Sequence, residues 1–343
     1  MQTVHREEGS RGRALHRVLS AQEAGVPQQT QSTRRARDIK IIRTISKIMV
    51  REQKIAGYDI TVPKHSAFQC ETDPMMFKMH MLMSVVARRG GGKGVFTSAV
   101  IERLPIDRLI LVSPSALSNK ELLDRFKKIL DPSDIFDDVN DPTVHDKVLA
   151  IVDEERDLLE EYQAKMKRYK SALKKVQSGN PLFQIPDSEM LIFGEGPPKH
   201  KWGGRKPCIL CYYDDVVGAG CMLGRGARRL TNLALRHRHA GQLQGGGAIG
   251  ISLVFNTQSF VTYGSLPKSI RNNLTVLALG KVTSGKDLKA IYEELAGEVD
   301  EDTFFQLYNT ATDKPFQFFV LDMHPKKEHP SPYRRGLDTF LIP

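Results

Sequence analysis

A glycine-rich segment followed at once by a lysine is the part of this chain best suited to chemistry. An apolar run ending at Val86 leads into Ala-Arg-Arg-Gly-Gly-Gly-Lys-Gly-Val at positions 87–95, and apolar residues then recur at helical spacing. That order predicts a strand, a tight turn and a helix. Backbone N–H groups in such a turn can close around an anion, and the helix N-terminus and Lys93 add positive charge. We therefore expect a nucleotide's phosphates to be bound by Gly90, Gly91, Gly92, Lys93, Gly94 and Val95.

This segment departs at two positions from the phosphate-binding pattern G-x-x-x-x-G-K-[ST]. Ala87 stands where the first glycine belongs, and Gly94 stands where a serine or threonine would offer a hydroxyl to Mg²⁺. Taken alone, the segment is equally compatible with a flexible surface turn. A nucleotide site therefore requires partners elsewhere in the chain.

A pair of carboxylates follows a second apolar run. Residues 207–213 have the length and composition of a buried strand, and Asp214 and Asp215 come directly after them. Two adjacent acids there are costly unless a cation or a proton transfer uses them, although an exposed pair that opens a turn is the alternative. In P-loop enzymes the first acid holds Mg²⁺ and the second orients or deprotonates the attacking water. Gln258 follows a third apolar run, 249–255, where its amide would address the γ-phosphate.

Strands and helices must alternate along the chain to position these residues. Apolar runs bounded by turn residues predict strands at 83–86, 108–112, 207–213, 249–255, 274–279 and 316–321. Helical spacing predicts helices at 120–130, 226–239, 287–295 and 303–309. This alternation indicates an α/β fold with a mostly parallel central sheet.

A long charged segment interrupts the alternation. Residues 141–179 carry apolar side chains at three- and four-residue spacing, which predicts a long amphipathic helix or a helical hairpin. Asp141 is the expected N-cap, Pro142 the first helical residue, and Gly179 lies at the far end. The apolar stripe is more typical of a packing face than of a ligand site.

Composition narrows the classes of partner. The formal net charge of +10 and the pI near 9.3 favour a polyanion, most commonly nucleic acid, although a basic surface without a partner is the alternative. The basic segment ending in Arg236-His237-Arg238-His239 is expected to face DNA or a subunit, with no need for a metal. No apolar run approaches the ~20 residues of a membrane span and no signal peptide is evident, which predicts a soluble intracellular protein.

The four cysteines do not suggest a disulfide framework. Cys208 and Cys211 form a C-x-x-C pair, but both lie in a predicted strand, where residues three apart point to opposite faces. Zinc binding at this pair is therefore disfavoured.

The order of these pieces resembles the viral genome-packaging ATPases of the FtsK-HerA superfamily, the poxvirus-type enzymes and their relatives in virophages and polinton-like viruses. The resemblance covers residues 75–343. It rests on the glycine-rich loop, Asp214-Asp215, Arg238-His239, Gln258, the run 269–275 (Ser-Ile-Arg-Asn-Asn-Leu-Thr), Lys286-Asp287-Leu288, 302–308 and 318–322.

The resemblance implies a RecA-like P-loop NTPase of the additional-strand type, which binds ATP and Mg²⁺. By this likeness Lys93 would contact the β- and γ-phosphates, Asp214 would hold Mg²⁺ and Asp215 would activate water. Gln258 would sense the γ-phosphate, and Arg271 would complete the site of a neighbouring subunit. The NTPase domain would occupy 38–140 and 180–330, with 141–179 as a helical insertion, 1–37 as a disordered basic arm and 331–343 as a C-terminal tail.

The function implied is translocation of double-stranded viral DNA into a preformed capsid by a homo-oligomeric ring of roughly five or six subunits. Such a motor would act at viral assembly sites in the host cytoplasm or nucleus, or in the virion. Two alternatives stay open at this point. One is a HerA-like cellular DNA translocase, and the other is a nucleotide- and DNA-binding subunit that does not hydrolyse ATP.

Overall fold

The computed structural model describes residues 70–178, 186, 191–192, 194–282, 284–295 and 299–343. All of them belong to one of the two compact units into which the chain divides, Ser66–Pro343. The basic arm expected at 1–37 lies outside the described residues.

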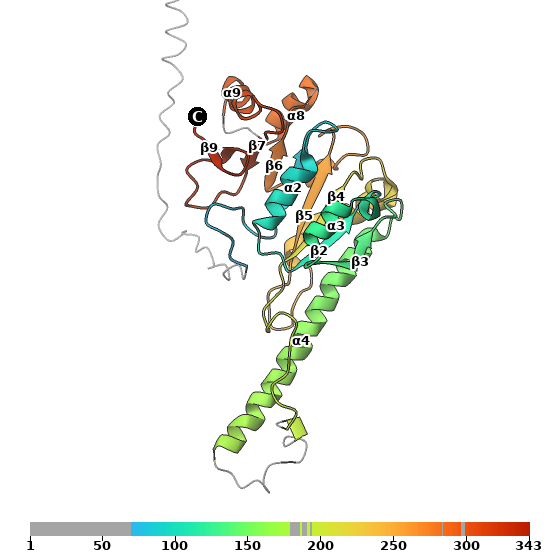
Figure 1. The fold of residues 1–343 in the computed structure, drawn as a ribbon, viewed down its shortest axis with the longest axis vertical. Coiled ribbons are helices and arrows are strands. Elements are labelled where there is room, and N and C mark those ends of the chain that lie inside the picture. The colour runs from blue at the N-terminus through green and yellow to red at the C-terminus, as the bar shows by residue number, and fades with distance from the viewer. Residues whose placement is uncertain (1–69, 179–185, 187–190, 193, 283, 296–298) are drawn as a thin grey trace, which may run out of the picture. The chain divides into compact units, whose positions relative to one another are not determined.

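One mixed sheet forms the centre of this unit (Figure 1). Its strands lie in the order β3-β2-β4-β5-β1-β6-β7-β8-β9. The strands from β3 to β6 in that order run parallel, and β7, β8 and β9 continue the sheet antiparallel. Their bounds are β1 Leu82–Val86, β2 Arg108–Val112, β3 Leu130–Phe136, β4 Ile209–Asp214, β5 Ile251–Thr257, β6 Val276–Leu279, β7 Phe319–Asp322, β8 Tyr333–Arg335 and β9 Thr339–Leu341.

The predicted α/β fold with a mostly parallel sheet is confirmed. The central strands β1 and β5 are buried along their whole length because helices cover both faces of the sheet, as in parallel sheets generally. β5 lies between β1, which leads into the glycine-rich loop, and β4, which ends in the acid pair.

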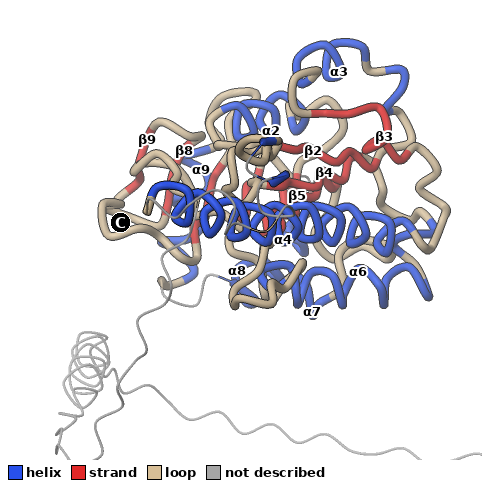
Figure 2. The backbone as a smooth tube through the Cα atoms, turned by 90° about the horizontal axis from the view of Figure 1, so that it is seen from below, coloured by secondary structure: helices blue, strands red, loops and turns tan. Residues whose placement is uncertain are grey.

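Helices cover the two faces of the sheet in separate layers (Figure 2). One layer holds α2 (Lys93–Glu102) and α3 (Lys120–Phe126), whose side chains join the core cluster that includes Phe96 and Phe126. The other layer holds α4 (Val144–Gln177), α6 (Gly224–Arg236), α7 (Lys268–Arg271), α8 (Gly285–Leu295) and α9 (Glu301–Ala311), whose side chains join the second cluster. No helix among the described residues combines the length and apolar character that a bilayer crossing needs.

The segment expected to be one long helix or a hairpin is a single helix, α4. Its N-cap is Thr143, so the prediction of Asp141 as N-cap and Pro142 as the first helical residue is wrong. The Asp141 carboxylate accepts hydrogen bonds from the backbone N–H and the hydroxyl of Thr143, at 2.7 and 2.6 Å. This local turn postpones the start of the helix by two residues.

The helix predicted at 120–130 is wrong in its last part, because α3 ends at Phe126 and Leu130 begins strand β3. β3 has exposed polar residues in its middle, so neither apolar alternation nor an apolar run marked it. β3 pairs with β2 along the sheet, and an ion pair reinforces this pairing. Arg108 of β2 contacts Asp134 of β3 at 2.7 Å and Glu155 of α4 at 2.8 Å.

One cysteine prediction needs correction. Cys70 and Cys208 form a disulfide, so the cysteines do contribute a covalent link between two distant segments. The reasoning about the C-x-x-C pair is supported, since Cys208 and Cys211 belong to core clusters on opposite faces of the sheet. Cys211 and Cys221 are free and buried, and burial raises the pKa of the Cys221 thiol to about 11.

Candidate functional site

The loop between β1 and α2 has the backbone shape of an anion cradle. Gly90 and Gly92 have φ values of +72° and +85°, in the left-handed region that favours glycine. A Cβ at Gly91 would lie 2.9 Å from the carbonyl oxygen of Arg88. Gly92 is the N-cap of α2 and supplies no side-chain cap, so the first N–H groups of the helix have no partner from that position. The three consecutive glycines are therefore each required by the turn.

Lys93, the first residue of α2, folds back over this loop. Its ammonium group donates hydrogen bonds to the carbonyl oxygens of Ala87 at 2.8 Å and Arg88 at 3.2 Å. Burial lowers the pKa of Lys93, while the carboxylates of Asp214 and Asp215 oppose that shift. The cation thus lies within electrostatic reach of the acid pair.

Asp214 is held at the end of β4 by a buried hydrogen-bond network. Asn256 of β5 donates from its amide nitrogen to Oδ1 of Asp214 at 3.0 Å and to the hydroxyl of Tyr212 at 2.6 Å. The hydroxyl of Thr97 on α2 donates to the amide oxygen of Asn256 at 2.8 Å. Asn256 is 1% exposed and pairs directly with Asp214 in the β4–β5 register. This amide therefore ties the helix after the loop to the first acid.

Asp215 adopts a left-handed backbone, with φ of +53°, and is exposed. Aspartate tolerates this conformation better than most residues, and here it ends the strand abruptly. Gln258, just after β5, donates from its amide nitrogen to Oδ1 of Asp215 at 3.3 Å. The two side chains meet because the carboxyl ends of parallel strands share one edge of the sheet, where ligands bind in α/β proteins.

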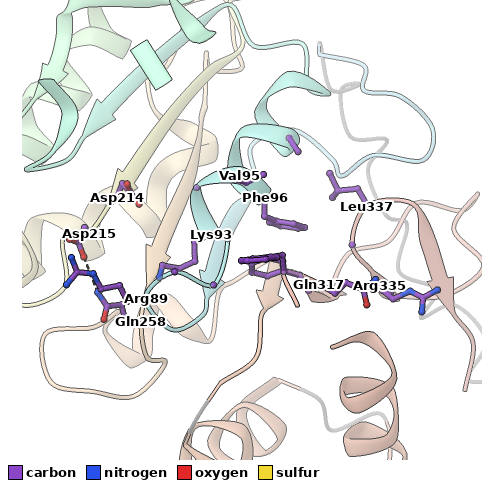
Figure 3. A pocket seen from close by; sticks show the side chains of 18 of the residues that line it. Arg89, Lys93, Val95, Phe96, Asp214, Asp215, Gln258, Gln317, Arg335 and Leu337 are labelled. Carbon is purple, nitrogen blue, oxygen red and sulfur yellow. Dashed lines mark hydrogen bonds between the residues drawn. The ribbon is translucent and has the colours of Figure 1, made fainter. Parts of the chain in front are cut away.

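These residues line one pocket of about 1230 Å³ (Figure 3). Its lining includes nearly all of the predicted site residues, namely Gly90, Gly91, Gly92, Lys93, Gly94, Val95, Asp214, Asp215 and Gln258. Figure 3 shows Lys93 between Asp214, Asp215 and Gln258 on one side and Phe96, Gln317 and Arg335 on the other. The structure thus brings together a cradle, a cation, two acids and an amide from three strand ends.

The far wall of the pocket was absent from the sequence prediction. It consists of Phe316–Phe318, just before β7, and of Arg335–Asp338, at the end of β8 and in the turn to β9. Phe316 has φ of +62°, and a Cβ at Gly92 would lie 3.2 Å from its ring. These segments follow the loop by more than 200 residues, so no local pattern connects them with it. Arg89 and Arg103 also line the pocket and were not singled out.

Arg271 lies outside this pocket. Its guanidinium contacts both carboxylate oxygens of Glu294, at 3.0 and 2.9 Å, and donates to the carbonyl oxygen of Leu266 at 2.9 Å. It also lies over the ring of Phe260, 5.1 Å from the centroid. A role for Arg271 in a neighbouring subunit's site stays a prediction.

The donor set of the pocket fits Mg²⁺ bound together with phosphates. Asp214 and Asp215 offer two adjacent carboxylates and Asp338 stands on the far wall, but no group of three or more His, Cys, Asp or Glu side chains that could hold a metal occurs in the described part of the chain. Mg²⁺ is usually held by one or two carboxylates, substrate phosphates and water, without an all-protein cage. The amide of Asn256 donates to Oδ1 of Asp214 and so fixes the orientation of this carboxylate at the pocket.

No model of a known protein family matches this chain, and no curated protein matches it. Among solved structures, the genome packaging NTPase B204 from Sulfolobus turreted icosahedral virus 2 with AMPPCP is 13% identical over 71% of this chain and 93% of its own, with a TM-score of 0.35. The pCW3 conjugation coupling protein TcpA with ATPγS is 14% identical over 76% and 60%, with a TM-score of 0.41. The type VII secretion ATPase EccC of Thermomonospora curvata is 14% identical over 74% and 24%, with a TM-score of 0.35. Because these sequence identities and TM-scores are low, we argue the function from this chain's own residues.

Proposed function

We propose that this chain is a Mg²⁺-dependent ATPase that drives the translocation of double-stranded DNA. The observation that carries the proposal is the pocket, where the glycine cradle, Lys93, the acid pair and Gln258 converge from distant parts of the sequence. Each of these groups matches one requirement of phosphoryl transfer to water, which depends on positioning and charge neutralisation. We place the motor in viral genome packaging on the basis of the ordered motifs across 75–343.

The cradle and Lys93 would bind the phosphates of ATP. In the structure the Lys93 ammonium contacts two backbone carbonyls, so phosphate oxygens would replace weaker, neutral acceptors with charged ones. The exposed N–H groups at the start of α2 add the partial positive charge of a helix N-terminus. Binding would therefore neutralise the charge that makes the terminal phosphate resistant to attack.

The two acids would have separate roles, set by their surroundings. Asp214 is held by Asn256 in the orientation suited to Mg²⁺, which when bound neutralises charge on the β- and γ-phosphates. Asp215 is exposed to the pocket and would accept a proton from the attacking water. Gln258, in contact with Asp215, would orient that water and report the presence of the γ-phosphate.

The DNA partner and the ring assembly follow from charge and from the trans role proposed for Arg271. The net charge of +10 supports binding to phosphates without base recognition, which a translocase needs because it moves along any sequence. Assembly on DNA at a preformed capsid would put the protein at viral assembly sites in the host cell or in the virion.

Gly94 favours a second candidate, a subunit that binds nucleotide and DNA without hydrolysis. It offers no hydroxyl to Mg²⁺ at the position where P-loop enzymes have one. Ala87 at the first glycine position points the same way. In that case the chain would regulate or complete a motor built with an active partner.

Steady-state ATP hydrolysis by the purified full-length protein, with and without double-stranded DNA, tests the proposal. We expect turnover that depends on Mg²⁺ and rises with DNA. Lys93→Ala should abolish ATP binding, whereas Lys120→Ala, at an exposed position on α3, should not change it. ATP binding without ATP hydrolysis would favour the second candidate. Unchanged ATP affinity in Lys93→Ala would contradict the assignment of the nucleotide site.

A further inference from the structure

Helix α6 and the short 3-10 helix after it, His237–His239, carry basic side chains and no acidic ones. Residues 224–239 read Gly-Arg-Gly-Ala-Arg-Arg-Leu-Thr-Asn-Leu-Ala-Leu-Arg-His-Arg-His, with five arginines and no acidic residue. The apolar side of the helix packs on the sheet through Leu230, Leu233 and Ala234, which are buried. The arginines are therefore confined to the other side.

Among the described residues, one of the five arginines has a side-chain partner and four have none. Arg229 contacts Asp146 of α4 at 2.8 Å and the carbonyl oxygen of Pro142 at 3.1 Å. The remaining four are exposed, and within the described residues none of them has a hydrogen-bond or ion-pair partner: Arg225, Arg228, Arg236 and Arg238. The first three lie on one side of the helix, because positions 225, 228 and 236 are separated by about one turn and then about two turns.

Like charges at this spacing repel one another and lower the stability of the helix. A bound anion would remove that repulsion. Guanidinium groups match phosphate oxygens with two parallel N–H donors, which makes a polyphosphate backbone a better fit than isolated carboxylates. Arg225 and Arg236 are about 16 Å apart along the helix axis at 1.5 Å per residue. The same length of duplex DNA carries about ten phosphates.

We propose that the outer face of α6, with Arg225, Arg228 and Arg236 and the following Arg238, binds the phosphate backbone of double-stranded DNA. The face carries no aromatic side chain. Proteins that bind single strands without sequence preference stack bases on aromatic rings, so this face suits a duplex better than a single strand. Contacts between arginines and phosphates carry no information about the bases, so we expect this face to bind DNA of any sequence.

The position of α6 in the chain connects this face with the acid pair, and here the inference rests on the proposed function. β4 ends at Asp214, Asp215 follows, and residues 216–223 lead directly into α6. This connection is tightly packed: the backbone N–H of Gly218 donates to Gly264 O at 3.0 Å, and that of Gly220 donates to Oδ1 of Asn140 at 3.0 Å. A Cβ at Gly226 would lie within 3 Å of the backbone of Gly220 and Cys221. DNA bound on α6 is thus one short, packed segment away from Asp215.

The test measures duplex DNA binding by fluorescence anisotropy, without nucleotide, over a range of salt concentrations. The variant Arg225→Gln/Arg228→Gln/Arg236→Gln keeps helix propensity, because glutamine is a good helix former. Its matched control, Lys120→Gln/Lys127→Gln/Lys128→Gln, removes the same charge from exposed positions on the opposite layer. Thermal unfolding checks that both triple variants fold. If the triple arginine variant does not fold, the single variants Arg225→Gln and Arg228→Gln replace it in the binding assay.

We expect the arginine variant to bind at least about tenfold more weakly at ~0.1 M salt, and the lysine control to stay close to the parent. Each lost phosphate contact lowers the slope of log affinity against log salt by about 0.9, so the slope should fall by about 2 to 3 units. Equal losses in the two variants would show that only overall charge matters and would overturn the proposal. So would tighter binding of a single strand of the same length.

Two further readouts separate this inference from the proposed function. Nucleotide binding and basal turnover should be unchanged in the arginine variant, while any DNA stimulation of turnover is lost. If the parent has no ATPase activity but its DNA binding depends on these arginines, the proposed function fails and the α6 surface stands. A variant that changes the oligomeric state and leaves DNA affinity unchanged would assign the face to a subunit interface and overturn the proposal.

Discussion

The amide nitrogen of Gln258 donates a hydrogen bond to Oδ1 of Asp215 at a distance of 3.3 Å. The two residues follow neighbouring parallel strands, β5 and β4, and both line the same pocket. The contact leaves Oδ2 of Asp215 available to a water molecule. It also couples the residue proposed to detect the γ-phosphate with the residue proposed to accept a proton.

The first prediction concerns the proton-accepting role of Asp215. Asp215→Asn keeps the size and shape of the side chain but cannot take a proton from water. We expect ATP affinity to be unchanged and turnover to fall by about 10²–10⁴-fold, the usual contribution of a general base. Asp313→Asn, an exposed position outside the pocket lining, is the control. A variant that still hydrolyses ATP at the parental rate would show that Asp215 is not the base.

The second prediction concerns Asn256, which joins Thr97, Tyr212 and Asp214. Asn256→Ala would leave these buried groups without their partner, at a cost of about 1–3 kcal/mol in the free energy of unfolding. Asp214 would also lose its orientation, so turnover and the apparent Mg²⁺ affinity should fall together.

Chemical denaturation and Mg²⁺ titration of ATPase activity measure the two effects of Asn256→Ala. Asn272→Ala, on the surface after α7, controls for the loss of an amide and should change neither quantity. A loss of stability with unchanged Mg²⁺ dependence would restrict Asn256 to a structural role.

The central part of the site was accessible from the sequence because each piece is tied to the end of an apolar strand. The glycine loop, Asp214-Asp215 and Gln258 follow β1, β4 and β5, and a parallel sheet necessarily brings such ends to one edge. Asn256 is different, because its importance depends on register: it pairs with Asp214 across two strands, which no local pattern shows.

The rest of the fold depended on contacts between distant residues or on very short elements. β8 and β9 span three residues each, too few for a periodicity to emerge, and they lie in the segment interpreted as a tail. β3 lacks apolar alternation, and its pairing with β2 is accompanied by the Arg108–Asp134 ion pair between distant residues. Cys70 and Cys208 are 138 residues apart, and no spacing rule predicts their disulfide. The environment of Arg271 was likewise invisible without its partner Glu294.

The third prediction separates two roles of Arg271. Both Arg271→Ala and Glu294→Gln break the ion pair between them, so both should lower the free energy of unfolding by about 1–3 kcal/mol. Only Arg271→Ala removes the guanidinium that would serve a neighbouring subunit. We expect turnover to be lost in Arg271→Ala and kept in Glu294→Gln.

Mixing experiments complete this test. Arg271→Ala protein mixed with Asp215→Asn protein should recover part of the activity, because some mixed interfaces combine an intact arginine with an intact base. No recovery despite demonstrated co-assembly would confine Arg271 to its own subunit, where it holds α7 against α8.

The fourth prediction concerns pH and His80. Burial, reinforced by the positive charges of His237, Arg238 and Lys206, lowers the pKa of His80 to about 4. A histidine in the unfolded chain has a pKa near 6.5. Between about pH 4 and pH 6.5, the unfolded state therefore binds a proton at this residue that the folded state does not bind. The contribution of His80 to stability is complete above pH 6.5 and is lost as the pH falls toward 4, on the order of 1–3 kcal/mol.

His80→Asn provides the comparison, because asparagine does not titrate and tolerates the left-handed φ of +56° at this position. Free energies of unfolding measured from pH 7 to pH 4 should fall less steeply in the variant than in the parent. His145 and His237 are shifted in the same direction by burial and act in both proteins, so the difference between the two curves isolates His80. Parallel curves would mean that the pKa of His80 is the same in the folded and unfolded states.

The fifth prediction concerns Gly94, the residue after Lys93. A serine there would place a hydroxyl where P-loop enzymes bind Mg²⁺, and the structure has room for it, because a Cβ at Gly94 would meet no atom within 4 Å. Gly94 also has no positive φ that would strain a side chain, unlike Gly90 and Gly92. Water can fill the vacant ligand position in the parent, so the protein should bind Mg²⁺ but orient it less well.

Gly94→Ser should therefore raise both Mg²⁺ affinity and turnover, by about tenfold to a hundredfold if the contact is worth about 1–3 kcal/mol. Gly94→Ala is the matched control, because it adds the same Cβ without the hydroxyl, and alanine gains more helix propensity than serine, so propensity alone would favour the control. Mg²⁺ titrations of ATPase activity in the three proteins separate the hydroxyl from the backbone effect. Equal rates in the serine and alanine variants would show that the metal is held in another way. If all three bind ATP and none hydrolyses it, the non-hydrolysing subunit becomes the better account of this chain.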